Sequence, residues 1–151
     1  MTDKKLHTLD ILNQLFTAER RSPLPRLAEM GVFVTWALAR EIEQVRRMVR
    51  EEAVHQAWLL EAAEDCGGGL APAGPDVTTA NLHYLDLQAV MPRVLDGLEK
   101  LVRLYTDAAQ HNHLLTPLAA ETIRRIAIRH QAHLDQFRDI YARVTASGSP
   151  T

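Results

Sequence analysis

The sequence Glu-Ala-Val-His at residues 52–55 is echoed, near the other end of the chain, by His-Gln-Ala-His at residues 130–133. The first and last side chains of each stretch are three residues apart, so on an α-helix they project from one face. In both segments that face is otherwise apolar, and it continues through Val45, Met48, Leu59, Ile123, Ile126, Phe137 and Ile140. Polar groups on the core side of a helix cost free energy unless a partner satisfies them. A bound metal ion would offset that cost.

The composition is that of a helical protein of single-domain size. The chain has 151 residues, of which 46% are hydrophobic and 24% charged, as is ordinary for a globular domain. Helix-forming Ala, Leu, Glu, Arg and Gln fill the long segments, and runs of β-branched residues are short. We therefore expect an all-α fold, with one domain over residues 1–145.

The charge balance excludes some classes of partner. Seventeen basic and nineteen acidic residues give a formal net charge of −2, which does not favour binding to nucleic acid or to an anionic membrane. No stretch approaches eighteen apolar residues, and the first residues are not followed by an uninterrupted apolar run. Cys66 is the single cysteine, so no disulfide framework is expected and a reducing compartment is the simplest assumption. These features predict a cytoplasmic protein.

Prolines mark the end of the first helix. Apolar spacing predicts this helix over residues 6–21, and Pro23 and Pro25 interrupt it because proline lacks a backbone donor. Leu24 and Leu27 then predict one or two further helical turns.

The second helix is expected over residues 36–66, with Thr35 as its N-cap and the glycines at 67–69 as its stop. Residues 67–82 form the longest stretch without a helical pattern. This length favours a crossover along the side of a bundle rather than a tight hairpin.

The third helix is expected to begin between residues 81 and 89 and to end near 110, with a turn at 111–113. Thr116 and Pro117 have the residue types that open a helix, which should run to about Val144. Residues 146–151 are expected to be a disordered tail.

Each of the four helices carries at least one metal-competent side chain on its apolar face. In chain order these are Glu19, Glu52, His55, Glu99, His130 and His133. A lone core histidine is more often bonded to a backbone carbonyl than to a metal. Six such groups on four helices would, however, need an improbable amount of unrelated hydrogen bonding, so together they predict a metal site.

Two neighbours of these candidates also need an interpretation. Glu51 is rotated by about 100° from Glu52 on a helix, so it should face solvent or a neighbouring subunit. Tyr105 lies at helical spacing from Leu98 and Val102 and is first of all a core residue, although a place near the metal is open to it.

Over nearly its whole length the chain resembles the ferritin-like di-iron carboxylate family, which includes bacterioferritins and rubrerythrins. Its members carry a Glu from each of two helices and a Glu-x-x-His pair from each of the other two. The matching stretches lie at residues 16–19, 51–55, 97–105 and 126–134. The resemblance implies an antiparallel four-helix bundle with a long crossover between the second and third helices. It also implies two iron ions, with Glu52 bridging, Glu19 and Glu99 capping one ion each, and His55 and His133 as nitrogen donors.

One position departs from the family pattern. His130 stands where the fourth helix of these proteins usually offers a Glu, so a second bridging carboxylate is missing and His130 would be an added terminal ligand. Two divalent ions carry four positive charges, which three carboxylates do not neutralise. Three imidazoles also make the site softer, so zinc, manganese or copper remain open beside iron.

Two classes of function follow from the sequence. The first is a ferritin-like protein with a dinuclear iron site that oxidises Fe(II) or reduces O₂ or peroxide. The second is a helical scaffold or interaction module that holds a structural metal such as zinc, or no metal. Apolar residues off the main face, among them Phe33, Trp36 and Trp58, predict self-association as a homodimer, with a larger cage also open.

Overall fold

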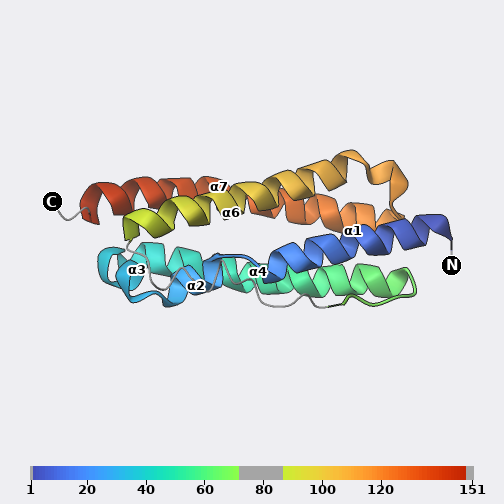
Figure 1. Cartoon of the computed structure of the whole chain (residues 1–151), viewed down its shortest axis with the longest axis horizontal. Helices are drawn as coiled ribbons and strands as arrows, with labels where there is room; N and C mark the ends of the chain where they lie inside the picture. Colours follow the sequence, from blue (N-terminus) through green and yellow to red (C-terminus); the bar gives the residue numbers. More distant parts are fainter. Residues whose placement is uncertain (1, 72–86, 149–151) are drawn as a thin grey trace.

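The structure is a computed structural model that describes residues 2–71 and 87–148. All regular secondary structure in these ranges is helical, which confirms the all-α class. The elements are α1 (Asp3–Arg20), α2 (Leu24–Glu29), α3 (Gly31–Trp36), α4 (Ala39–Asp65), α6 (Leu87–Gln110), the 3₁₀ turn η2 (Asn112–Leu114) and α7 (Pro117–Gly148). The long helices α1, α4, α6 and α7 all run along the long axis of the molecule (Figure 1).

The first helix ends close to its predicted end at residue 21 but begins earlier than the predicted residue 6, at Asp3. Thr2 is its N-cap, and the Thr2 hydroxyl accepts a hydrogen bond from the backbone N–H of Lys5 at 3.2 Å. The helix ends at Arg20, and the chain resumes as α2 beyond Pro23. Leu24 and Leu27 are fully buried, which confirms the expected return to helix.

The prediction for the start of the second long helix is wrong. Thr35 lies inside the short helix α3, and α4 begins at Ala39 after Leu38, whose side chain makes no capping hydrogen bond. Phe33 is fully buried and anchors α3 in the core. Tertiary burial has therefore overridden the local capping signal. It also withdraws Phe33 from any self-association surface, whereas the side chain of Trp36 lies outside the described part of the chain.

Glycine ends α4 as expected. Gly67 has φ of 80°, a conformation that side chains disfavour, and its N–H donates to the carbonyl of Glu64 at 2.9 Å. Gly68 donates to the carbonyl of Ala63 at 3.1 Å, which completes a Schellman motif. Most of the predicted crossover at 67–82 lies outside the described residues.

The last two long helices follow their predicted order. α6 runs over Leu87–Gln110, η2 occupies the predicted turn, and α7 opens at Pro117. α7 is longer than expected, because it continues past Val144 to Gly148. The expectation of a disordered tail from 146 is thus wrong for residues 146–148, where Ala146 favours helix and no proline intervenes.

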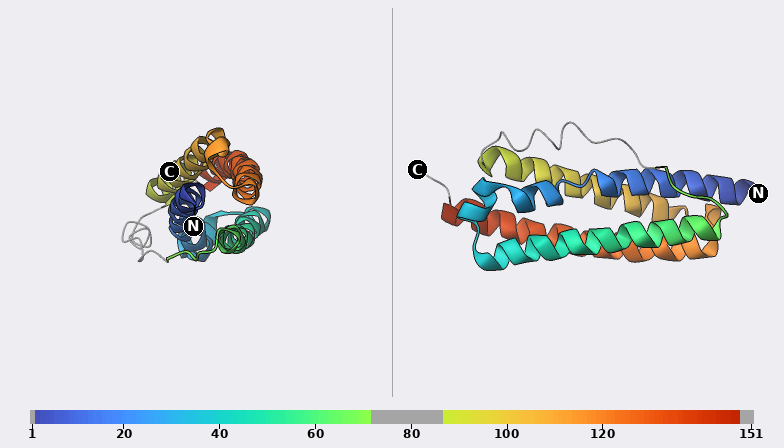
Figure 2. Two further views of the ribbon diagram at one scale, coloured as in Figure 1. Left: turned by 90° about the vertical axis from the view of Figure 1, so that its right-hand side faces the viewer. Right: turned by 90° about the horizontal axis from the view of Figure 1, so that it is seen from below.

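One core lies between the long helices. α7 packs against α6 and α4, and α1 packs against α4 and α6. Seen end-on, the four lie side by side around a common centre (Figure 2). Fully buried apolar side chains from each of them fill the centre, including Leu12, Val45, Leu59, Val94, Ile123, Ile126, Phe137 and Ile140. Within the described ranges, no helix combines the length and the hydropathy needed to cross a membrane.

Candidate metal centre

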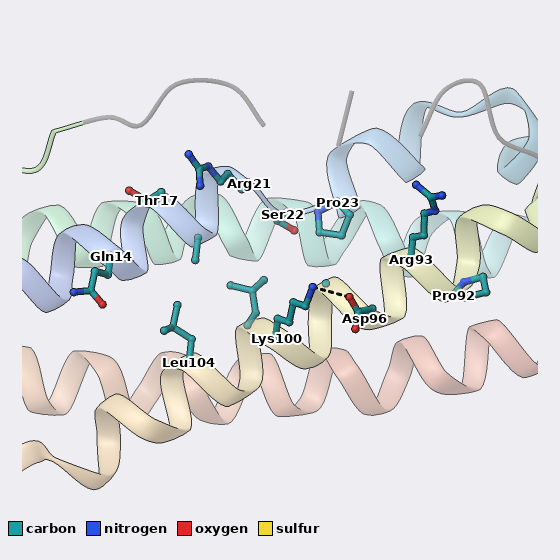
Figure 3. A pocket seen from close by; sticks show the side chains of 13 residues that line it. Gln14, Thr17, Arg21, Ser22, Pro23, Pro92, Arg93, Asp96, Lys100 and Leu104 are labelled. Carbon is teal, nitrogen blue, oxygen red and sulfur yellow. Dashed lines mark ion pairs between the residues drawn. The ribbon is translucent and has the colours of Figure 1, made fainter. Parts of the chain in front are cut away.

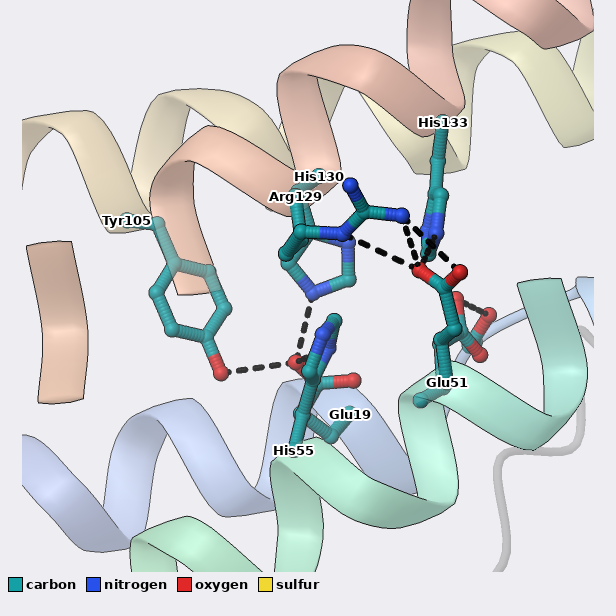
Figure 4. A network of polar contacts seen from close by, with 9 residues as sticks. Glu19, Glu51, His55, Tyr105, Arg129, His130 and His133 are labelled. Carbon is teal, nitrogen blue, oxygen red and sulfur yellow. Dashed lines mark hydrogen bonds and ion pairs between the residues drawn. The ribbon is translucent and has the colours of Figure 1, made fainter. Parts of the chain in front are cut away.

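Five of the six predicted ligands meet inside the core, between α1, α4 and α7. Figure 4 shows Glu19 on α1, His55 on α4, and His130 and His133 on α7. Glu52 also comes from α4. Each is at most 3% exposed to solvent. The sequence places these groups 33 to 114 positions apart across the helices, so only the fold brings them together. The result is a buried group of two carboxylates and three imidazoles.

Glu19 is the centre of the contacts. Its Oε1 accepts a hydrogen bond from the Tyr105 hydroxyl at 2.8 Å, lies 2.5 Å from His130 Nε2 and lies 3.4 Å from His55 Nδ1 (Figure 4). Its Oε2 is buried and has no hydrogen-bond partner among the described residues, and the same holds for His55 Nδ1. Glu19 Oε1 therefore has several polar neighbours, whereas Glu19 Oε2 and His55 Nδ1, which can both bind metal, have no hydrogen-bond partner among the described residues.

The surroundings keep Glu19 ionised. Burial by itself would raise the pKa of Glu19, but the hydrogen bond of His130 and the nearby imidazole of His55, at 3.4 Å, outweigh it and lower the pKa to about 2. The pKa of Tyr105 is raised well above its usual value, first by burial and then by the neighbouring Glu19 charge. Tyr105 therefore remains a protonated donor to a charged carboxylate.

Glu52 is in the opposite electrostatic situation. Its Oε1 accepts a hydrogen bond from Ser22 Oγ at 2.9 Å, and both side chains are buried. Burial, followed by repulsion from Glu19, raises the pKa of Glu52 well above 4.5, although Ser22 opposes the rise. Two neighbouring carboxyl groups whose pKa values are pushed apart are characteristic of functional sites.

Sequence reasoning missed Ser22. Its hydroxyl also accepts a hydrogen bond from the N–H of Leu24 at 3.3 Å, so it links the start of α2 to the centre. A polar residue between the end of the first helix and Pro23 was the available signal. That signal indicates a turn, however, and not the direction of the hydroxyl.

The ligand atoms form two overlapping groups. Single ligand atoms of Glu19, His55 and His130 lie within 4.8 Å of one another, as do those of Glu52, His130 and His133. His130 belongs to both groups. Carboxylate oxygen and imidazole nitrogen are ligands that suit iron, zinc and other first-row transition metals. The donor set therefore fits a transition-metal ion.

The prediction that Glu99 joins the centre is wrong. Its side chain is 32% exposed and lies 3.5 Å from Arg138 Nη2 on α7. The inward face of α6 runs through Val94, Leu98, Leu101 and Tyr105, all buried, and Glu99 is rotated away from it. The apolar residues of α6 cover a wide face, so the sequence allows two rotations of this helix about its axis. Packing against the neighbouring helices favours the rotation that directs Tyr105 inward and Glu99 outward.

The prediction that Glu51 faces solvent or a neighbouring subunit is incomplete. Its side chain is 30% exposed, but its carboxylate also lies 2.6 Å from His133 Nε2 and forms an ion pair with Arg129 at 2.7 Å (Figure 4). Burial would raise the pKa of Glu51, but the hydrogen bonds of Arg129 and His133 lower it below 4.5. The pKa of His133 is lowered, first by burial, against the opposing effect of Glu51.

A cavity of about 710 Å³ lies between α1 and α6 beside the centre (Figure 3). Thr17, Ala18 and Ser22 line it from one side, and Lys100 and Leu104 from the other. Ser22 borders both the cavity and the centre, because the same residue lines the cavity and donates to Glu52. The cavity is thus within one side chain of the candidate ligands.

No known protein family, characterised protein or solved structure matches this chain.

Proposed function

We propose that this chain is a metal-binding protein whose centre holds a divalent transition-metal ion. The observation that carries the proposal is the convergence of Glu19, Glu52, His55, His130 and His133, each at most 3% exposed, in the middle of the core. Removing a carboxylate from water costs several kcal/mol even after relaxation. Such a group of residues needs a compensating charge.

Hydrogen bonding within the protein compensates only part of this cost. Glu19 Oε2, His55 Nδ1 and His133 Nδ1 are buried without a hydrogen-bond partner among the described residues. Each unsatisfied buried group costs about 1–3 kcal/mol. Carboxylate oxygen and imidazole nitrogen are also metal ligands, so metal bound in the two ligand groups would satisfy these atoms.

A dinuclear iron site in a ferritin-like four-helix bundle is the finer form of the proposal. The two overlapping ligand groups around His130 support it, because they offer two places for an ion. Iron there would supply redox chemistry: two Fe(II) ions give up two electrons, which with two protons reduce O₂ to hydrogen peroxide or hydrogen peroxide to water. Glu19 and Glu52 would hold the ions, the imidazoles would add nitrogen donors, and the cavity behind Ser22 would admit a small oxidant.

The charge of the centre favours a second candidate function, a structural zinc site. Among residues 2–71 and 87–148, the ligand groups of the centre contain only the carboxylates of Glu19 and Glu52, whose two negative charges neutralise one divalent ion and not two. A single ion bound by carboxylate and imidazole is a common form of zinc coordination. Zinc would then stabilise the fold without turnover.

Metal analysis of the purified protein tests the proposal and separates its two forms. Protein purified without chelator should contain tightly bound metal: close to two iron ions per chain supports the dinuclear form, and close to one zinc ion the structural form. Anaerobic Fe(II) loading followed by air should give ferric absorbance only in the first case. A Glu19→Ala, Glu52→Ala double variant is the control. Wild-type protein that takes up no metal from Fe(II), Zn(II) or Co(II) solutions would refute the proposal.

A further inference from the structure

The partly exposed carboxylate of Glu51 contacts the buried centre without belonging to its ligand group. Glu51 lies on α4 next to Glu52, and its Oε2 is 2.6 Å from His133 Nε2 on α7. The other ring nitrogen, His133 Nδ1, is buried and has no hydrogen-bond partner among the described residues. The two nitrogens of one imidazole are therefore in different environments.

We propose that Glu51 is a positioning residue, which holds His133 in the tautomer with the proton on Nε2 and so leaves the Nδ1 lone pair for the metal ion. This inference rests on the proposed metal-binding function. A neutral imidazole carries one N–H and one lone pair, and an ionised carboxylate can only accept a hydrogen bond. The proton of His133 must therefore lie on Nε2 to make the contact with Glu51.

Arg129 fixes the orientation of Glu51. Its Nη2 lies 2.8 Å from Oε1 and 2.7 Å from Oε2 of Glu51, and its Nε lies 3.1 Å from Oε2. A bidentate contact of this kind restricts the orientation of the carboxylate plane as well as the distance between the carboxylate and the guanidinium group. Arg129 lies on α7, four residues before His133. The helix that carries the ligand His133 therefore also carries the arginine that orients Glu51.

The rings around His133 show that it belongs to the centre. Its ring centroid lies 5.9 Å from that of His130 and 6.0 Å from that of His55. A histidine ligand that donates its second N–H to a carboxylate is a recurrent feature of metal sites, and loss of that carboxylate weakens metal binding 10- to 100-fold. Glu51 has the position of such a carboxylate, which lies outside the ligand group and orients one ligand, and Arg129 holds Glu51 in place.

The first measurement needs no metal. Nitrogen-15 NMR of the histidine side chains in metal-free protein should show the Nε2–H tautomer for His133. Glu51→Ala should lose this preference, whereas Glu51→Gln, which keeps an acceptor oxygen, should retain part of it. Glu43→Gln is the matched control, because Glu43 also lies on α4 and forms a 2.7 Å ion pair with an arginine, Arg50, away from the centre. An Nδ1–H tautomer in the wild-type protein would overturn the inference, even if no variant folds.

The second measurement is the affinity for Zn(II), determined by competition with a chelator, with Co(II) absorbance as a spectroscopic check. Glu51→Ala should bind Zn(II) 10- to 100-fold more weakly than wild type, Glu51→Gln should fall between them, and Glu43→Gln should match wild type. Wild-type protein that binds neither Zn(II) nor Co(II), and also takes up no Fe(II), refutes the metal-binding function itself. Wild-type binding that Glu51→Ala leaves unchanged refutes only the role of Glu51.

Discussion

His130 Nε2 lies 2.5 Å from Glu19 Oε1, a contact that joins α7 to α1 across 111 positions of sequence. Both side chains are fully buried, and the same carboxylate oxygen accepts the Tyr105 hydroxyl from α6. Three helices therefore meet at one oxygen atom. An ion bound between Glu19 and His130 would act on the packing of the whole core, so metal binding and folding stability should be coupled.

Glu19→Gln should remove most of the stabilisation that metal gives. The amide keeps the size of the side chain but is a poor metal ligand and removes the charge. Wild-type protein with free Zn(II) at 1,000 times its dissociation constant should gain about 4 kcal/mol in the free energy of unfolding. The variant should gain less than about 1 kcal/mol under the same conditions. Urea unfolding with Zn(II) and with chelator measures both gains, and equal gains in the two proteins would contradict the assignment of Glu19.

Glu99→Ala should leave metal binding almost unchanged, although the sequence pattern included Glu99 among the candidate ligands. Its carboxylate faces Arg138 at the surface, and an exposed ion pair contributes only about 0–1 kcal/mol to stability. Glu52→Ala is the matched comparison and should weaken Zn(II) binding at least about 100-fold. Loss of a residue that only hydrogen-bonds to a ligand weakens metal binding about 10- to 100-fold, and loss of a ligand should cost at least as much. Similar losses in the two variants would show that Glu99 reaches the centre.

Glu52→Gln should have opposite effects on the metal-free and the metal-loaded protein. Burial and the Glu19 charge raise the pKa of Glu52 above 4.5, so the stability that its protonated form provides is lost as the pH rises from 4.5 through the raised pKa. Glutamine imitates the protonated form. Metal-free Glu52→Gln should therefore equal wild type near pH 4 and exceed it in melting temperature at pH 7 and above.

With saturating Zn(II) the order should reverse at neutral pH, because only the wild type has the carboxylate that binds the ion. Thermal melts at several pH values, with Zn(II) and with chelator, measure both comparisons. A metal-free variant that melts below wild type at every pH would contradict the raised pKa.

Tyr105→Phe should destabilise the protein without abolishing metal binding. The substitution removes the hydroxyl that donates to Glu19 at 2.8 Å while keeping the buried ring. The lost hydrogen bond to a charged group should cost about 1.5–3 kcal/mol in the metal-free protein. Chemical denaturation of the metal-free protein and of the metal-free variant gives this value. Loss of all metal binding would instead make Tyr105 a ligand.

The sequence was sufficient to predict most of the helices and five of the side chains that meet in the core, because both depend on local periodicity. Paired polar residues three apart on an apolar face, as in Glu52 and His55, can only project into the core together. The proline and glycine signals around α1 and α4 also act locally. These predictions needed no knowledge of how the helices pack.

The errors arise where packing decides. Glu99 and Tyr105 both lie near the apolar face of α6, and the rotation of that helix against its neighbours determines which of them points inward. Glu51 was expected to face solvent or a neighbouring subunit, and its contacts within the chain were missed because a helical wheel of α4 does not show that Arg129 and His133 of α7 lie across from it. Thr35 failed as a cap because burial of Phe33 holds α3 in place.

Filling the cavity between α1 and α6 should slow metal uptake without weakening it. The ligands are almost inaccessible to solvent, and Ser22 separates Glu52 from the cavity. Thr17 lines the cavity and is only half-buried, so Thr17→Trp places a large ring in the open space without replacing a core side chain. Stopped-flow Co(II) binding should show an association rate at least tenfold lower, while the dissociation constant at equilibrium stays within about twofold of wild type.

Lys5→Trp is the control for this experiment, because it adds the same ring at an exposed position of α1 away from the cavity. An unchanged association rate in Thr17→Trp would show that the ion enters elsewhere, and the side of the centre covered by Glu51 and Arg129 would be the next place to examine. Arg129→Ala should then increase the rate, since it removes the ion pair that holds Glu51 over His133.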